Sequence, residues 1–560
     1  MKAIYKSLIA AALAAPALTG CIEESIPTNT VLATQLEGNA NAIQAFASAM
    51  PAHLNVMATI DQKYHFDFGW PSMMHARDVM TEDMFVRYAG GFDWFSSWSR
   101  NEVSLGPRYL VCQYSWNYYY AQILTTNNTI KVCNPESEDP SERYNLGAAK
   151  AFRAMTYLDA GRCYEVLPTT VNTGNSDEGN PIIGLTLPIV TEETTEDDMR
   201  NNPRATHATL FEFIVNDLTE AVTLMEGYAR PAKTMPDVAC AKGLLARAYL
   251  WDASFQAEVN SDNAAAAASY GKAAQYAREA IAESGATPLT RDQWLNPTSG
   301  FNDINVSSWM WGGQYTAEDD AVVAGGIRTW TSFCSNEQNF GYAGSECGAY
   351  SEIGASVYRR INDNDFRKLS FVAPEDSPLS GQEVYLNRQY AEEKFDGPYI
   401  ALKFRPGQGE MDDPKVGAVV GYPLMRVEEM YFIEAEAVAH TNPAAGQGLV
   451  ESFMRTYRFP QYSGQSSSET ALINEIVFQK RVELWGEGRS FYDVKRLNLS
   501  VTRWYEGTNF EEAASTFNTV GRPAWMNFCI VSQEVDNNPA IKGYNTPSPN
   551  GLYKAATNAD

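Results

Sequence analysis

Two carboxylates near the C-terminus have the spacing of an acid–base pair. Glu483 and Glu487 are four residues apart, which on a helix places both on one face. A glycosidase needs an acid and a base held about 5 to 10 Å apart across a cleft. Neighbouring arginines lower the pKa values of both carboxyl groups, so neither group keeps the proton that a general acid must donate. We therefore predict a structural arginine–carboxylate lattice that locks the last helices together, with Arg481, Arg489 or Arg496 as the compensating cations.

Other catalytic and metal-binding patterns do not occur in the sequence. Its histidines and cysteines form no His-x-x-x-His or Cys-x-x-Cys pair, the spacing from which zinc and di-iron centres are built. No Gly-x-Ser-x-Gly nucleophile motif is found. We predict a protein that is not an enzyme and has no metal and no cofactor, and a surface glycoside hydrolase stays the least favoured alternative.

Charge and composition restrict the partners. The 560 residues include 68 acidic and 43 basic residues, a net charge of −25. Nucleic acids are bound through the counterions that Lys and Arg displace, so we expect no nucleic-acid partner. With 44% hydrophobic and 20% charged residues, the chain has the composition of a globular protein with a large core.

The N-terminus has the pattern of a secretory signal. Lys2 and Lys6 precede an apolar run over residues 8–18 that is too short to span a bilayer. Such a run is typical of the central region of a signal peptide. We predict that residues 1–20 are a signal peptide that is removed.

The signal ends in a cysteine motif. Residues 18–21, LTGC, resemble the lipobox of bacterial lipoproteins, and this resemblance implies that Cys21 takes a diacylglyceryl thioether. Several acyl chains give stable attachment to a membrane, so residues 21–40 are expected to be an acylated tether. Glu23 and Glu24 resemble the acidic export signal of surface lipoproteins of the Bacteroidetes type, the alternative being a solvated tether.

Removing Cys21 leaves seven cysteines, an odd number that excludes complete pairing within the chain. Cys163 and Cys240 lie in helical patterns and are predicted to be buried thiols. In an oxidising compartment two disulfide bonds remain possible, Cys112 with Cys133 and Cys334 with Cys347.

Helical periodicity dominates two stretches, residues 145–284 and 423–497. Apolar residues recur at i, i+4, i+7 and i+10, the pattern of an amphipathic helix. The helices predicted on this basis cover residues 145–162, 206–225, 236–255, 264–284, 423–440, 448–457 and 469–486.

A faint repeat points to stacked helix pairs. Residues 149–158 align without gaps with 241–250, sharing Ala-Lys, a central Ala and Tyr-Leu. Small residues at fixed places allow close helix packing, as in tetratricopeptide-type hairpins. Gly, Ser, Asn and Asp interrupt residues 293–421, which with residues 60–120 we predict to be rich in loops.

Two segments resemble a known family. Residues 424–437, LMRVEEMYFIEAEA, resemble the L-x-R-x-x-E-x-y-L-x-x-A-E-A helix of the RagB/SusD family of Bacteroidetes outer-membrane lipoproteins. Residues 480–496, KRVELWGEGRSFYDVKR, resemble its E-R-R-x-E-L-x-x-E-G-x-R-x-x-D-x-x-R signature, with Gln479 where the family often has Glu. The segment ending in YEVLP at residues 164–168 is similar to a third family motif, with Glu165 replacing Gly.

The resemblance implies a fold and a function. The fold is mostly α-helical, a single SusD-like domain over residues 41–560 with a tetratricopeptide-like scaffold and a loop-rich ligand-facing half. The function is that of a lipid-anchored receptor, exposed on the outer membrane, which captures a glycan and hands it to a SusC-like TonB-dependent transporter. A peptide-binding receptor of the same family is the alternative.

A sugar presents C–H faces that favour aromatic planes and hydroxyls that need polar partners. Aromatic residues near polar ones in loop-like segments are therefore candidate ligand contacts, whereas residues 116–120 are expected to pack in the core. His65, Asp67 and His75 are expected to have structural roles. The candidate contacts are Trp94, Trp98, Asn101, Trp309, Trp311, Tyr315 and Trp330.

Overall fold

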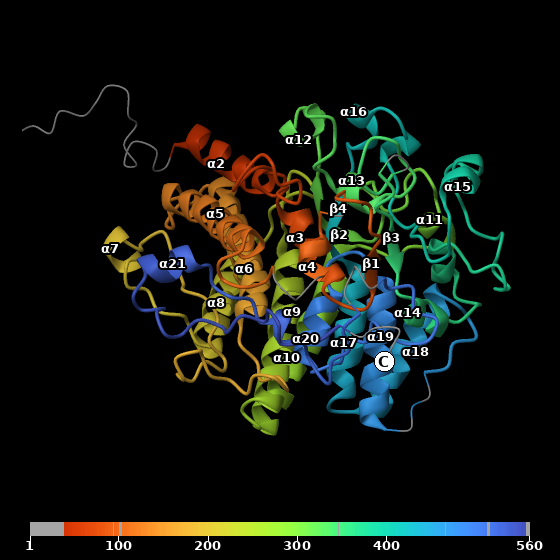
Figure 1. The fold of residues 1–560 in the computed structure, drawn as a ribbon. Coiled ribbons are helices and arrows are strands. Elements are labelled where there is room, and N and C mark those ends of the chain that lie inside the picture. The colour runs from red at the N-terminus through yellow and green to blue at the C-terminus, as the bar shows by residue number, and fades with distance from the viewer. Residues whose placement is uncertain are drawn as a thin grey trace, which may run out of the picture.

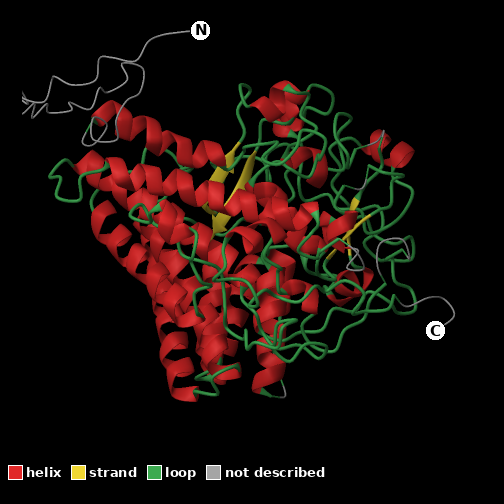
Figure 2. Cartoon of the chain, turned by 60° about the vertical axis from the view of Figure 1, so that its left-hand side comes forward, coloured by secondary structure: helices red, strands yellow, loops and turns green. Residues whose placement is uncertain are grey.

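The computed structural model describes residues 39–92, 94–99, 104–344, 347–464, 466, 468–511 and 516–555. Cys21, Asn101, the expected signal peptide and nearly all of the expected tether lie outside the described residues. The fold is mostly α-helical, as predicted, with two small antiparallel sheets (Figure 1). Figure 2 shows the long helices gathered on one side and the loops on the other.

The long helices pack on one another in chain order, as stacked hairpins do. In the first half the successive neighbours are α5 (Leu110–Val132), α6 (Pro140–Tyr164), α8 (His207–Met225), α9 (Val238–Glu258) and α10 (Asn263–Ser284). α10 then packs on α17 (Val427–Ala439), which contacts α18 (Pro443–Tyr457) and α19 (Glu469–Glu483). α2 (Ala40–His53) lies across α5 and α6.

Local sequence sets the helix ends. The Thr206 hydroxyl accepts from the Thr209 amide at the start of α8, and Asp237 caps α9, which begins two residues later than predicted. Gly285 ends α10 with a left-handed φ of 61°. Ser468 caps α19.

The small residues of the repeat do allow close packing. A Cβ at Gly243, on α9, would stand 2.4 Å from the sulfur of Met425 on β4 (Gly421–Arg426), so a side chain there would have to displace the Met425 side chain that packs on the helix. Gly243 lies within the repeat segment 241–250.

The helix predicted over residues 423–440 begins only at Val427. Residues 421–426 form strand β4 instead, paired antiparallel with β2 (Trp309–Gln314), and every residue of β4 is buried. Backbone pairing with β2 satisfies the amides that a helix would otherwise satisfy. The second sheet pairs β1 (Met84–Val86) with β3 (Ser351–Ile353).

Residues 293–421 contain short elements and loops, but the prediction for residues 60–120 was wrong in part. That region holds α3 (Trp70–Val79), α4 (Ser96–Ser99) and the start of α5. The remaining elements are α7 (Glu196–Met199), α11 (Arg291–Trp294), α12 (Asp320–Val323), α13 (Trp330–Cys334), α14 (Ala355–Arg360), η1 (Phe366–Ser370), α15 (Arg388–Lys394), η2 (Gly407–Gly409), α16 (Pro414–Gly417), α20 (Ser490–Arg496), η4 (Ala524–Met526) and α21 (Ser532–Asn537).

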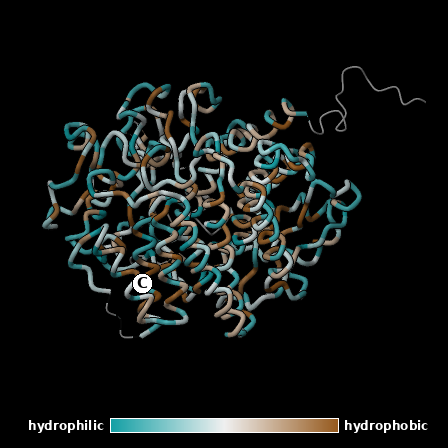
Figure 3. Tube along the Cα trace, turned by 180° about the vertical axis from the view of Figure 1, so that it is seen from behind, coloured by the Kyte–Doolittle hydropathy of each residue, from teal (hydrophilic) through white to brown (hydrophobic). Residues whose placement is uncertain are grey.

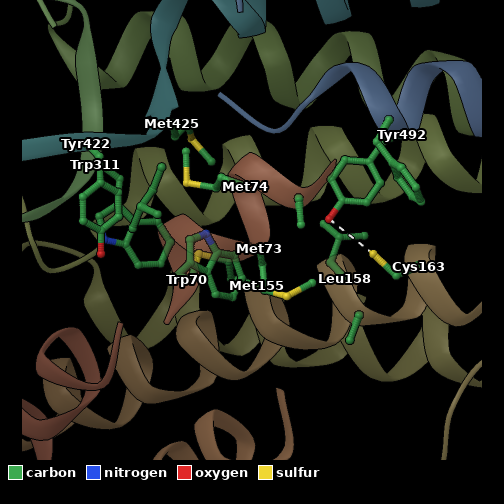
Figure 4. Close-up of a cluster of buried hydrophobic side chains, with 14 of the residues drawn as sticks. Trp70, Met73, Met74, Met155, Leu158, Cys163, Trp311, Tyr422, Met425 and Tyr492 are labelled. Atoms are coloured by element: carbon green, nitrogen blue, oxygen red, sulfur yellow. Dashed lines mark hydrogen bonds between the residues drawn. The ribbon is translucent and has the colours of Figure 1, made fainter. Parts of the chain in front are cut away.

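One large hydrophobic core joins the helical layer to the loop-rich half. Figure 3 shows largely hydrophilic outer loops around it, and Figure 4 shows Trp70, Trp311 and Met425 among its members. Within the described part of the chain no helix is both long and apolar enough to cross a membrane.

Neither disulfide left open by the sequence forms. Cys112, Cys133 and Cys334 are free, buried thiols, so Cys334 is not bonded to Cys347. Cys163 and Cys240 are buried thiols, as predicted.

The arginine–carboxylate lattice exists, but with other partners than predicted. Glu483, fully buried, receives two hydrogen bonds of 2.7 Å from Arg458 and further ones from Arg426 and Arg367. α19 ends at Glu483, so Glu487 lies in the following turn, where it pairs with Arg426 and Lys403. The cations expected to compensate these two carboxylates serve other acceptors: Arg481 pairs with Asp83, Arg489 donates to the Leu424 carbonyl, and Arg496 pairs with Glu436.

Candidate ligand-binding site

Five of the predicted contact residues lie in the interior. The expectation that they face the ligand is wrong because neighbouring elements cover them. The side chains of Trp98, Trp309, Trp311, Tyr315 and Trp330 are at most 1% exposed.

Trp311 shows how this happens. β4 pairs with its strand, the ring meets Phe152 of α6 edge-on at 4.9 Å, and its Nε1 donates to the Thr234 carbonyl at 3.1 Å. Figure 4 shows Trp311 among the buried side chains. Trp330 packs in the same way between Phe404 and Tyr422. These rings stabilise the core and present no face to a ligand.

Among the candidate contacts that lie within the described residues, Trp94 is the one that reaches the surface. It is half-buried and lines a surface pocket of about 490 Å³. Three segments converge there: the loop before α3, the segment before and within α4, and the start of α5. The lining residues are Tyr64, Phe66, Gly91, Trp94, Ser96, Ser104, Arg108, Tyr109, Leu110 and Val111.

Aromatic contacts fix the plane of Trp94. Its ring stacks on His65 at 4.8 Å with an angle of 19° and meets Tyr342 edge-on at 6.1 Å. His65 Nδ1 and the Tyr342 hydroxyl form a hydrogen bond. Burial, assisted by the nearby Arg328, lowers the pKa of His65, so a neutral imidazole backs the indole near pH 7.

The pocket combines the groups that a polyhydroxylated ligand needs. Trp94 and Tyr64 supply rings, while Arg108 and the two serines supply polar groups at the rim. Tyr109 is 43% exposed, so a ligand in the pocket has a further ring within reach.

His75 and Asp67 have the structural roles expected of them. His75 is fully buried against Cys334, and burial lowers its pKa to about 3. Asp67 accepts from the Thr59 hydroxyl at 2.8 Å and from the Ile60 amide at 2.7 Å. Asp67 therefore holds the loop that carries Tyr64, whereas His75 packs in the core against Phe95 and Phe333.

Sequence reasoning missed Tyr64, Arg108 and Tyr109. A signal was available, because Arg108 and Tyr109 follow Gly106-Pro107 and so stand in a turn before a helix. The proximity of Tyr64 to Trp94 depends on tertiary packing, which has no local pattern.

Comparisons with known proteins agree on one family. Residues 387–547 match the model of the SusD family. No curated protein matches the chain.

Solved structures share the fold over most of the chain. A SusD-like carbohydrate-binding protein from Bacteroides vulgatus is 20% identical, with a TM-score of 0.68 over 90% of this chain and 98% of the other. A SusD superfamily protein from Bacteroides thetaiotaomicron is 19% identical, with a TM-score of 0.64 over 90% and 99%. Another from Bacteroides vulgatus is 16% identical, with a TM-score of 0.64 over 90% and 98%.

The family-model match lies in the segment that carries the lattice residues Lys403, Arg426, Glu483 and Glu487. The helical scaffold over the rest of the chain is the one shared with the solved SusD-like structures. The SusD family consists of non-catalytic binding proteins. Residues 387–547 thus match the SusD family, and the chain has the fold of the solved SusD-like proteins.

Proposed function

We propose that this protein captures an oligosaccharide at the Trp94 pocket and delivers it to a SusC-like TonB-dependent transporter. The observation that carries the proposal is the held plane of Trp94 in a pocket of about 490 Å³ rimmed by hydroxyl, phenol and guanidinium groups. The carbohydrate-binding SusD-like relative from Bacteroides vulgatus supports the same class of ligand.

The proposal places the protein on the outer surface of the cell, tethered to the outer membrane through an acylated Cys21. A shallow surface pocket returns modest free energy after its ordering costs, so each site binds weakly. Retention then depends on several sugar units or on enclosure by the transporter.

Affinity gels with embedded polysaccharides test the site. We expect Trp94→Ala to lose at least about tenfold in affinity, since a stacking aromatic contributes on the order of 1 kcal/mol beyond its buried area. Tyr88→Ala is the matched control, because Tyr88 is an aromatic residue that is 53% exposed and does not line the pocket. If Trp94→Ala is retarded like the unaltered protein by every polysaccharide that retards the latter, the assignment of the site is wrong.

The same gels separate the binding classes. Retardation by polysaccharides, with no new reducing ends after long incubation, supports a glycan receptor. Binding of peptides alone would contradict the proposal in favour of peptide uptake.

A further inference from the structure

A second cavity lies farther along α5. It measures about 520 Å³ and is bounded by α5, α7, α21 and the chain near Pro188. Figure 1 shows α7 and α21 together beside α5. Nothing in the proposed function uses this cavity. Its lining residues are Trp116, Asn117, Tyr120, Ala121, Leu124, Pro188, Val190, Glu196, Met199, Arg200, Asn202, Glu534, Asn537 and Asn538.

One wall of this α5–α21 cavity is aromatic and rigid. The rings of Trp116 and Tyr120 lie 4.5 Å apart, and Trp116 also meets Tyr164 edge-on at 5.3 Å. The Tyr120 hydroxyl donates to the Pro188 carbonyl at 2.7 Å. A ligand therefore meets ring surface that does not have to be ordered on binding.

The cavity lining also includes one buried polar atom that lacks a hydrogen-bond partner among the described residues. Asn538 is 2% exposed, and its Nδ2 donates to the Asn202 carbonyl at 2.7 Å. Its Oδ1 has no hydrogen-bond partner among the described residues. Because a buried amide oxygen is costly to leave unpaired, this atom marks a place for a donor from outside the chain.

The charged residues of the cavity are already occupied. Glu196 and Arg200 pair with each other, and Glu534 accepts from Asn538 Nδ2 at 3.2 Å. The half-buried Asn117 forms no side-chain hydrogen bond within the described part of the chain. The groups still available are thus neutral amides, which favour a neutral, hydroxyl-rich ligand over an ionic one.

Both cavities lie on one stripe of α5. Leu110 lines the Trp94 pocket, whereas Asn117, Ala121 and Leu124 line the α5–α21 cavity. These positions follow the i, i+7, i+11, i+14 spacing of a single helical face. At about 1.5 Å per residue, Leu110 and Leu124 are about 21 Å apart along the helix.

We infer that the α5–α21 cavity is a second binding site for neutral oligosaccharide, placed so that one extended chain reaches both sites. The inference rests on the proposed function, because both sites take the same class of ligand. Simultaneous occupation converts the second contact into an intramolecular one and raises the overall affinity.

Methyl NMR of the methionine-labelled protein tests this site directly. Met199 lines the cavity, is 42% exposed and is assigned with a Met199→Leu variant. The probes are maltohexaose, cellohexaose, mannohexaose and xylohexaose, with penta-alanine as the peptide arm. We expect at least one hexasaccharide to shift the Met199 methyl signal in a saturable way.

Variants on α5 separate the outcomes. Ala121→Trp fills the cavity and is expected to abolish the shift, and Asn117→Ala is expected to weaken binding about 3- to 10-fold, the effect of one neutral hydrogen bond. Asn128→Ala is the matched control, since Asn128 is an exposed asparagine of the same helix outside the lining. No Met199 shift with any hexasaccharide, a shift with penta-alanine alone, or a shift that persists in Ala121→Trp would overturn the inference.

Trp94→Ala distinguishes failure of this site from failure of the first. If the second site is real, the variant keeps the Met199 shift. If only the second site fails, retardation in affinity gels is still reduced by Trp94→Ala, while no hexasaccharide shifts the Met199 methyl signal. If only the first fails, Met199 responds and the gels do not depend on Trp94.

Discussion

Glu165 stands where the related motif has glycine, and its carboxylate organises a buried cluster. It accepts from His207 Nδ1 at 2.6 Å and from Trp251 Nε1 at 2.7 Å, while His207 Nε2 lies 3.1 Å from Asp252 Oδ1. The His207 ring also stacks on Phe255 at 3.8 Å. Burial disfavours the imidazolium, but the two carboxylates outweigh it and raise the pKa of His207 above 6.5. At pH 6 a protonated His207 therefore joins α8, α9 and the end of α6.

This cluster makes stability depend on pH. The contribution of His207 to the free energy of unfolding is fully present below about pH 6.5, the pKa of a histidine in the unfolded chain. It is lost as the pH rises through the higher pKa that His207 has in the folded chain. We expect His207→Gln to lower the free energy of unfolding at pH 6 by about 3 kcal/mol, because it leaves two buried carboxylates uncompensated. The measurement is denaturant unfolding between pH 5.5 and 9, reading the free energy of unfolding at each pH.

His53→Gln is the control for that titration. Burial lowers the pKa of His53 to about 4, so above about pH 8 its proton is absent from both folded and unfolded chains. This variant should keep the slope of the unaltered protein in the alkaline range. An unchanged slope in His207→Gln would contradict the charged-histidine account.

Single residues also show where sequence reasoning stops. Trp309 and Trp311 lie on strand β2, whose partner β4 is more than a hundred residues away in the sequence and covers them. Trp94 has the same chemistry and a similar loop context but no covering element. Burial of a ring depends on distant segments, so local composition cannot separate these cases.

At the scale of elements, the lattice around Glu483 joins the C-terminal helices to the loop-rich half. Arg458 comes from the end of α18, Arg426 from the end of β4 and Arg367 from η1, and all three donate to one carboxylate of α19. Gln479 takes the place of an acidic residue, and its amide oxygen accepts from Arg367. A hydrogen bond from the Arg367 guanidinium to a neutral amide thus takes the place of the ion pair that a Glu would form there.

Glu483→Gln tests the lattice. Burial opposes ionisation of Glu483, but Arg458, Arg426 and Arg367 outweigh it and hold its pKa well below 4.5. The Glu483 carboxylate therefore stabilises the fold above pH 4.5, and this stabilisation is lost as the pH falls through the pKa that Glu483 has in the folded chain. We expect the variant to lose about 3 to 5 kcal/mol in denaturant unfolding at pH 7, since it leaves buried guanidinium charge uncompensated.

The matched control is Glu451→Gln. Its pair with Arg455 is a surface i, i+4 contact, so the expected loss is below about 1 kcal/mol. Equal losses in the two variants would show that the lattice adds nothing beyond surface pairing.

Element prediction succeeded where one helix face is apolar. α8 has buried residues at i, i+4, i+8 and i+11 from Leu210 and was predicted to its last residue. All of α5 was missed because aromatic residues such as Trp116, Tyr118 and Tyr119 are buried around several sides of the helix, which removes the amphipathic contrast. β4 was missed because Pro423 also fits a helix start.

At the scale of the whole molecule, the expected tether leads directly into the layer that carries both proposed sites. Asn39 caps α2, whose helix packs on α5 and α6. α5 in turn lines the Trp94 pocket and the α5–α21 cavity. The proposed anchor and the proposed binding face therefore share one rigid block of helices.

Cys21→Ser tests the anchor. Without the thioether the protein has no acyl chains, and we expect it to leave the outer-membrane fraction while its glycan binding in solution stays unchanged. Fractionation with metabolic fatty-acid labelling measures the first effect, and affinity gels measure the second. Continued membrane association without label would contradict the lipobox assignment, and Lys6→Arg, which preserves the signal charge, is the control.

The buried tryptophans have a consequence for optical assays. Seven of the twelve indoles, those of Trp70, Trp98, Trp309, Trp311, Trp330, Trp485 and Trp525, are less than 2% exposed. Their emission reports the apolar interior and shifts to the red only when the core opens. A glycan over Trp94 alters the surroundings of a minority of the emitters, so intrinsic fluorescence will report denaturation strongly and ligand occupancy faintly.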